Sequence, residues 1–138
     1  MRRLVVILAI VVAVLVYFGY REVYPSDRFY LGEFTSGCQT TLSASARVVC
    51  ARVDFPPHLG DYTSEALIDV DASDFARLLA ELQTRTHLSP CTADPVMQVC
   101  GRKLDVQTCV WDLTPGHDWI VWGLLRDGKT LFFRAIIT

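Results

Sequence analysis

The stretch WIVWGLLRDGKTLFFRAIIT, residues 119–138, contains two apolar, β-rich segments joined by Asp127-Gly128. It predicts a β-hairpin, because both central residues of a type I′ turn need positive φ angles, and Asp-Gly accommodates them. A three-residue turn with a bulge would shift the pairing by one residue. The two-residue turn pairs three residues of the first strand with three of the second: Trp122 with Phe133, Gly123 with Phe132, and Leu124 with Leu131.

Both strands of this hairpin are apolar on both faces. A strand with one face in water would instead alternate apolar and polar residues. We therefore expect the hairpin to lie at the centre of a sheet, or to be covered on its second face by a helix or a partner.

Upstream, residues 71–85 (DASDFARLLAELQTR) predict an amphipathic helix. Asp71 or Ser73 can cap its first turn by accepting hydrogen bonds from free backbone amides. Its apolar side chains recur at the spacing of one helix face: Phe75, Leu78, Leu79 and Leu82.

Residues 47–55 alternate as a half-buried strand that ends at Pro56 and Pro57. The alternation places four residues on one face: Val49, Ala51, Val53 and Phe55. Further strands are expected around residues 29–34, 65–70, 96–100 and 104–111. This order predicts an α+β fold, namely a small, mostly antiparallel sheet with one packed helix and the C-terminal β-hairpin.

Residues 4–20 (LVVILAIVVAVLVYFGY) carry no charged side chain. As a helix, 17 residues extend for about 26 Å, close to the roughly 30 Å of a bilayer's hydrocarbon core. They predict an N-terminal transmembrane helix that acts as a signal anchor. The alternative, a cleaved secretory signal, would start the mature chain after about Tyr20, but the small-x-small cleavage pattern is missing there.

Arg2 and Arg3 precede the apolar stretch, so the positive-inside rule keeps the N-terminus in the cytoplasm. We expect a bacterial inner-membrane protein that crosses once, with a periplasmic C-terminal domain. The bacterial source is inferred from compactness and from the lack of N-x-[ST] glycosylation sites. The chain then divides into a membrane helix (1–22), a tether with the first strand (23–36), and a disulfide-stabilised extracytoplasmic α+β domain (37–138).

The charge of the domain argues against nucleic acid as a partner. Three of the 13 Lys and Arg, and one of the 15 Asp and Glu, lie in residues 1–22. The remaining 10 and 14 leave a net charge of −4 on residues 23–138. A mildly acidic domain is poorly suited to binding a phosphate backbone.

Five cysteines follow the apolar stretch: Cys38, Cys50, Cys91, Cys100 and Cys109. A small domain outside the cytoplasm can keep disulfides, so we expect them to stabilise the fold. Short spacing favours pairing Cys38 with Cys50 and Cys91 with Cys100, although a Cys100–Cys109 pair competes. The first arrangement leaves Cys109 as the odd thiol, which could be buried, reactive, or the link of a disulfide-bonded dimer.

The sequence contains no nucleotide-binding, serine-hydrolase or zinc-protease motif, and no cofactor or metal is expected. Cys100, Cys109 and His117 lack the short ligand pair of a metal site. His58, His87 and His117 are the candidate general bases, and all three fall in predicted loops. Binding is therefore favoured over catalysis, and the alternative is a periplasmic enzyme acting on thiols or cell-wall material through Cys109 or a histidine.

Trp119 and Trp122 are three residues apart, so on a strand they point to opposite faces and cannot both enter one core. Large aromatic side chains at the centre of a surface patch are typical of protein recognition sites. Trp119 and Trp122 are the candidate binding residues. The sequence predicts a membrane-anchored periplasmic binding protein, either an accessory subunit of an envelope complex or an inhibitor or immunity protein.

Overall fold

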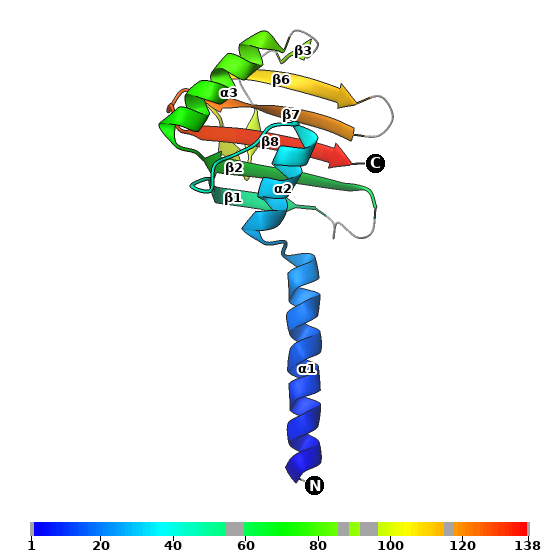
Figure 1. The fold of residues 1–138 in the computed structure, drawn as a ribbon. Coiled ribbons are helices and arrows are strands. Elements are labelled where there is room, and N and C mark those ends of the chain that lie inside the picture. Colours follow the sequence, from blue (N-terminus) through cyan, green and yellow to red (C-terminus); the bar gives the residue numbers. More distant parts are fainter. Residues whose placement is uncertain (1, 55–59, 86–88, 92–96, 115–117, 138) are drawn as a thin grey trace.

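The computed structural model describes residues 2–54, 60–85, 89–91, 97–114 and 118–137. Within these ranges it confirms an α+β fold with antiparallel strands (Figure 1). The main sheet has six strands in the order β1-β2-β8-β7-β6-β3, and β4 and β5 form a separate hairpin. The elements are α1 (Arg2–Val23), α2 (Asp27–Gly37), β1 (Arg47–Val53), β2 (Tyr62–Asp69), α3 (Ala72–Thr84), β3 (Ser89–Pro90), β4 (Gln98–Val99), β5 (Arg102–Lys103), β6 (Val106–Thr114), β7 (Asp118–Leu125) and β8 (Thr130–Ile137).

The predicted C-terminal hairpin, β7 and β8, lies at the centre of the sheet. All three predicted pairs are present: Trp122 with Phe133, Gly123 with Phe132, and Leu124 with Leu131. The turn is not type I′, however, because only Gly128 of the Asp127-Gly128 pair has a positive φ angle, +75°. Asp127 instead accepts hydrogen bonds from the amides of Lys129 and Thr130 (3.0 and 2.9 Å), so its side chain closes the turn.

Helices α2 and α3 cover one face of the sheet, which we call the helix face (Figure 1). At its centre Trp122 is fully buried, and the ring of Phe34 meets it edge-on, with the ring centroids 5.5 Å apart. The guanidinium of Arg85 lies 5.9 Å from the Trp122 ring centroid, within the range of a cation–π contact. The same guanidinium donates to the carbonyl of Cys38, so it connects the end of α3 to the end of α2.

Helix α2 occupies the region where the sequence analysis expects the first strand, residues 29–34. That prediction is wrong because the aromatic residues suggested a strand, whereas the burial follows a helical spacing. Tyr30, Phe34 and Cys38 recur every fourth residue, and all three are buried on the helix face. The domain therefore has two packed helices instead of the one predicted.

Helix α3 confirms the predicted amphipathic helix at residues 71–85. Asp71 is its N-cap and accepts a 2.8 Å hydrogen bond from the amide of Asp74. Asp71 also accepts from the hydroxyls of Ser73, Ser43 and Ser45, and these hydrogen bonds hold its pKa far below the usual range. The cap thus joins α3 to the segment that leads into β1.

Two β-bulges alter the predicted faces of the strands. In β1 a bulge between Val48 and Cys50 places Val48 and Ala51 together on the helix face and leaves Val49 45% exposed. The predicted grouping of Val49 with Ala51 is therefore wrong. A second bulge, between Val106 and Thr108 in β6, interrupts that strand's alternation in the same way.

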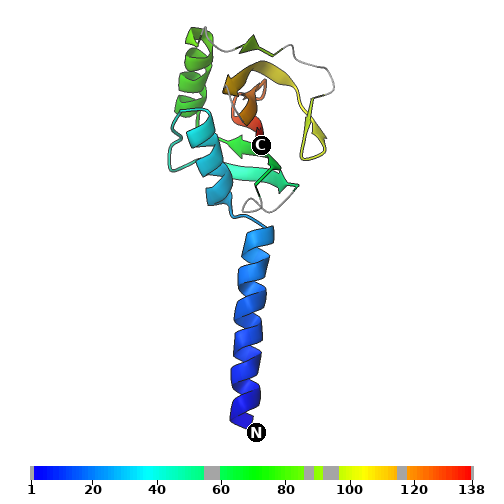
Figure 2. The same cartoon turned by 90° about the vertical axis from the view of Figure 1, so that its right-hand side faces the viewer.

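The opposite face of the sheet, which we call the second face, is covered by Cys91 and by residues 97–105 (Figure 2). The short strands β4 and β5 belong to this covering segment, whereas β3 is the edge strand of the main sheet, beside β6. The covering segment encloses a smaller apolar cluster, whose buried members are Leu67, Val99, Leu104, Val106, Cys109, Val121 and Phe132. The middle of the central hairpin is therefore covered on both faces, as its apolar pattern predicts.

Helix α1 extends away from the rest of the chain (Figure 1), and its large apolar side chains between Val5 and Tyr20 are exposed. Among the described residues, no helix is long and apolar enough to cross a membrane.

Gly123 provides a test of how the central hairpin packs. A Cβ atom there would lie 2.3 Å from the carbonyl oxygen of Thr108 and 2.6 Å from Cβ of Cys109. Gly123→Ala should therefore lower the free energy of unfolding by about 1–3 kcal/mol, the usual cost of overpacking. The measurement is thermal unfolding of the full chain in detergent, followed by circular dichroism.

Gly32→Ala is the matched control, since a Cβ at this α2 position meets nothing within 4 Å. It should leave the domain unchanged or stabilise it by about 0.5–1 kcal/mol, because alanine is the better helix former. Equal melting temperatures for Gly123→Ala and the wild type would show that β6 and β7 do not approach this closely.

Candidate functional site

The strand register arranges the second face in three cross-strand rows. The outer row contains Trp119, Ile136 and Thr63, and ends at Asp54, whose amide donates to the Thr63 carbonyl (3.0 Å). The middle row contains Val121, Arg134, Glu65 and Arg52. The inner row contains Cys109, Gly123, Phe132, Leu67 and Cys50.

These rows differ in how far the covering segment reaches over them. In the inner row Phe132 and Leu67 are buried in the second-face cluster. In the outer row Trp119 is 57% exposed, and Ile136, its partner on β8, is 37% exposed. The apolar end of β7 and β8 is therefore open to solvent on this face.

The middle row lies between the covered inner row and the exposed outer row. In it, the carboxylate of Glu65 is buried and fully hydrogen-bonded. Arg134 donates to it from Nε (3.0 Å) and Nη2 (2.7 Å). The other carboxylate oxygen accepts from the amide of Cys100 (2.8 Å), and Arg134 also donates to the carbonyl of Gln98 (2.6 Å). Because a buried charge is tolerated only when it is paired and hydrogen-bonded, Glu65 and Arg134 fix the β4–β5 hairpin to the sheet.

Between this hairpin and the outer row lies an open cleft of about 380 Å³. Charges of both signs line it, including an exposed ion pair between Arg52 and Asp54 (3.2 Å). The full lining is Arg52, Asp54, Thr63, Glu65, Gln98, Gly101, Arg134 and Ile136. Trp119 is paired with Ile136, one of the lining residues, so its exposed ring lies next to this end of the cleft.

Of the two candidate tryptophans, one is exposed and the other is buried. They face opposite sides of the sheet, as their spacing predicts, with Trp119 in the outer row and Trp122 in the helix-face core. Trp122 has no exposed surface, so its assignment as a binding residue is wrong. Arg134 was not among the predicted site residues, although it is the one charge within the apolar strand LFFRAII, which is a signal of a paired or functional charge.

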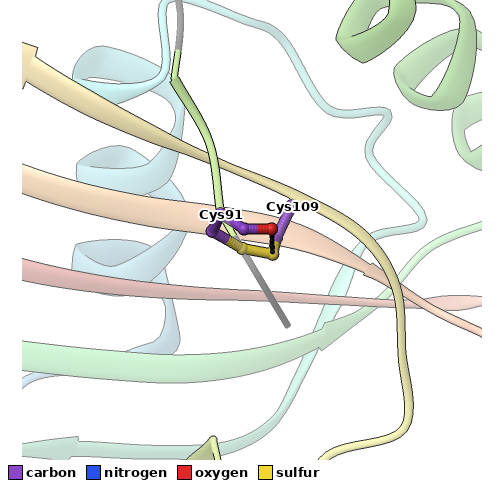
Figure 3. The surroundings of a disulfide bond; sticks show 2 residues. All are labelled: Cys91 and Cys109. Carbon is purple, nitrogen blue, oxygen red and sulfur yellow. Dashed lines mark hydrogen bonds between the residues drawn. A yellow bond between two sulfur atoms is a disulfide. The ribbon is translucent and has the colours of Figure 1, made fainter. Parts of the chain in front are cut away.

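The cysteines pair differently from the sequence prediction. Cys91 is bonded to Cys109, with their Cα atoms 5.3 Å apart (Figure 3). This bond corrects the predicted Cys91–Cys100 pair and excludes Cys109 as the odd thiol, as the link of a dimer, or as a reactive nucleophile. Cys38 is buried on the helix face and Cys50 packs on the second face, so the sheet separates the predicted Cys38–Cys50 pair.

The three candidate general bases, His58, His87 and His117, lie outside the described residues. Within the described ranges, no three histidine, cysteine or acidic side chains are grouped so that they could hold a metal ion.

Comparisons with known protein families, with curated proteins and with solved structures gave no match to this chain. The functional assignment therefore depends on the geometry of the second face.

Replacing each tryptophan in turn distinguishes a surface role from a core role by the change in unfolding free energy. Trp122→Ala should cost about 3–5 kcal/mol of unfolding free energy, because it leaves a cavity beneath both packed helices. Trp119→Ala should cost no more than about 1 kcal/mol, the size of one cross-strand contact. Thermal unfolding of the full-length variants in detergent measures both effects.

Trp122→Phe is the control for the core. Among the described residues the indole N–H of Trp122 has no hydrogen-bond acceptor, so phenylalanine keeps most of the packing and loses no hydrogen bond. A Trp119→Ala variant that unfolds as readily as Trp122→Ala would show that Trp119 is structural.

Proposed function

We propose that this protein is a membrane-anchored periplasmic binding protein whose outer row and cleft bind a partner protein. The observation that carries the proposal is the exposure of Trp119 on a central strand whose other apolar residues are covered. Tryptophan and arginine are the residues most enriched at the energetic centres of protein interfaces. Here Trp119 lies in the row next to Arg134 and Arg52.

The charge distribution supports a protein partner over a small charged molecule. Glu65 already neutralises Arg134, and Asp54 pairs with Arg52, so the charges of the described lining residues balance and favour no small ion of one sign. Alternating charges beside an apolar patch instead suit a polar rim around an aromatic contact. The partner is either a neighbouring subunit of an envelope complex or an enzyme that this domain inhibits.

Helix α1 is the membrane anchor in this proposal. Its 22 residues extend for about 33 Å, and its apolar side chains have no protein cover within the described structure. Only residues 24–26 separate it from α2, and the rings of Tyr20 and Tyr24 lie 4.7 Å apart at this junction, where aromatic side chains suit the membrane interface. The Cys91–Cys109 bond suits the oxidising periplasm.

The anchor predicts that the full chain stays with inner membranes after an alkaline carbonate wash. Val11→Asp with Val12→Asp should release it, because each aspartate at the centre of a membrane helix costs about 3 kcal/mol. Val11→Ala with Val12→Ala is the matched control and should remain bound. Recovery of the wild-type chain in the wash would refute the anchor.

The binding surface predicts a partner that depends on Trp119. After crosslinking in cells and solubilisation in detergent, the full chain should capture a specific protein, identified by mass spectrometry. Trp119→Ala should reduce its recovery about tenfold or more, since a central aromatic contact contributes at least 1.4 kcal/mol at such sites. Val49→Ala, an exposed apolar residue on the edge strand β1, should leave capture unchanged.

If Trp119→Ala and Val49→Ala capture the partner equally well, the outer row is not the binding surface. Because Trp119 is exposed, Trp119→Ala should reduce capture without unfolding the domain. The melting temperature of each variant checks that it remains folded.

A further inference from the structure

Cys50 and Cys100 meet at the β1 end of the inner row. Cys50 lies in β1, opposite Leu67, and its side chain packs on the second-face cluster. Cys100 lies in the turn between β4 and β5, and its side chain packs on the same cluster. The two free thiols come from segments 50 residues apart in the sequence and lie on the same side of the sheet, close enough for Cys50 to raise the pKa of Cys100.

The backbone of Cys100 is held in place for this contact. Its φ angle is +52°, an uncommon value for a residue other than glycine. Its amide donates to the carboxylate of Glu65, which Arg134 binds from the other side. The position of the Cys100 thiol is therefore set by the same charged pair that fixes the hairpin.

The bonded pair Cys91–Cys109 lies at the other end of the same row. Cys109 is on β6 and Cys50 is on β1, so the inner row crosses five neighbouring strands, a width of about 19 Å at 4.8 Å per strand. Cys91 and Cys100 are nine residues apart, and nine extended residues reach about 30 Å. The covering segment can thus be joined to the sheet at both ends of one row.

We propose that Cys50 and Cys100 form a second disulfide, which fixes the β4–β5 hairpin to the edge strand β1. The oxidant is a disulfide of a small thiol or of a protein. The Cys50 thiolate attacks one sulfur of the donor and releases the first thiol. Cys100 then loses its proton and attacks the mixed disulfide at the Cys50 sulfur, which releases the second thiol and leaves the Cys50–Cys100 bond.

The surroundings of Cys100 favour this order of attack. Burial raises the pKa of the Cys100 thiol, and the nearby Cys50 and Glu65 raise it further. A raised pKa lowers the fraction of thiolate, which is the attacking species, so Cys100 is the weaker first nucleophile. Once Cys50 holds the mixed disulfide, Cys100 lies on the same apolar cluster as the sulfur that it must attack.

The bond would also stabilise one wall of the candidate site. Gln98 and Gly101, on either side of Val99 and Cys100, line the cleft. With the hairpin joined to β1, this wall cannot separate from the Arg52 side of the cleft. The inference depends on an oxidising environment and not on the identity of a partner.

The test uses the wild-type full chain, taken from membranes with an acid quench and alkylated in denaturant without reductant. Peptide mass spectrometry should find a linked Cys50–Cys100 peptide beside the linked Cys91–Cys109 peptide, with alkylation confined to Cys38. Cys50→Ser and Cys100→Ser should each lose the new linked peptide and leave the remaining partner alkylated. Cys38→Ser is the matched control and should keep both linked peptides.

Alkylation of Cys50 and Cys100 in a chain whose Cys91–Cys109 peptide stays linked would overturn this proposal alone. Alkylation of all five cysteines would overturn both the second disulfide and the periplasmic location. Neither result bears on capture through Trp119, so the binding surface is tested separately from the second disulfide.

Discussion

The structure depends on one constraint, that the central hairpin β7–β8 is apolar on both faces and must be covered on both. On one side Trp122 and Phe133 are buried under α2 and α3. On the other side Val121 and Phe132 are buried under Cys91 and residues 97–105. Apolar burial contributes roughly 25 cal/mol per Å², so exposing either face would remove a large part of a small domain's margin of stability.

The two covers differ in regular structure and in how much of the sheet they bury. The candidate site lies where the second cover ends. Helices α2 and α3 satisfy most of their backbone hydrogen bonds internally, and β2 adds hydrogen bonds from the Tyr62 and Ser64 hydroxyls to Glu33 on α2. The second cover has only two-residue strands and relies on the sheet for hydrogen bonds, chiefly through Glu65 and Arg134. Where this cover ends, Trp119 and Ile136 remain exposed, so the cleft lies at the edge of the covered area.

Local patterns predicted the parts of the fold that local physics determines. The hairpin register follows from a short turn, and α3 follows from its apolar spacing and the Asp71 cap. Helix α2 was missed because its aromatic residues favour strands, although their spacing is helical. Trp119 and Trp122 point in opposite directions because side chains alternate along a strand and the two residues are three apart. Which of them enters the helix-face core depends on where α2 and α3 pack, and the local sequence does not show this. The cysteine pairing was wrong because the sheet register, not sequence proximity, brings Cys109 to Cys91.

The Cys91–Cys109 disulfide lies on the face whose cover has less regular structure. Ordering a segment with little regular structure costs about 1–2 kcal/mol of backbone entropy per residue, and its few ladder hydrogen bonds offset little of that cost. Closing the 18-residue separation between Cys91 and Cys109 contributes about 3 kcal/mol in the chain-entropy model. The bond therefore offsets part of the entropy cost of ordering the cover on the second face. On the helix face, by contrast, α2 and α3 contribute their own backbone hydrogen bonds, and Cys38 is buried among the apolar side chains of that face.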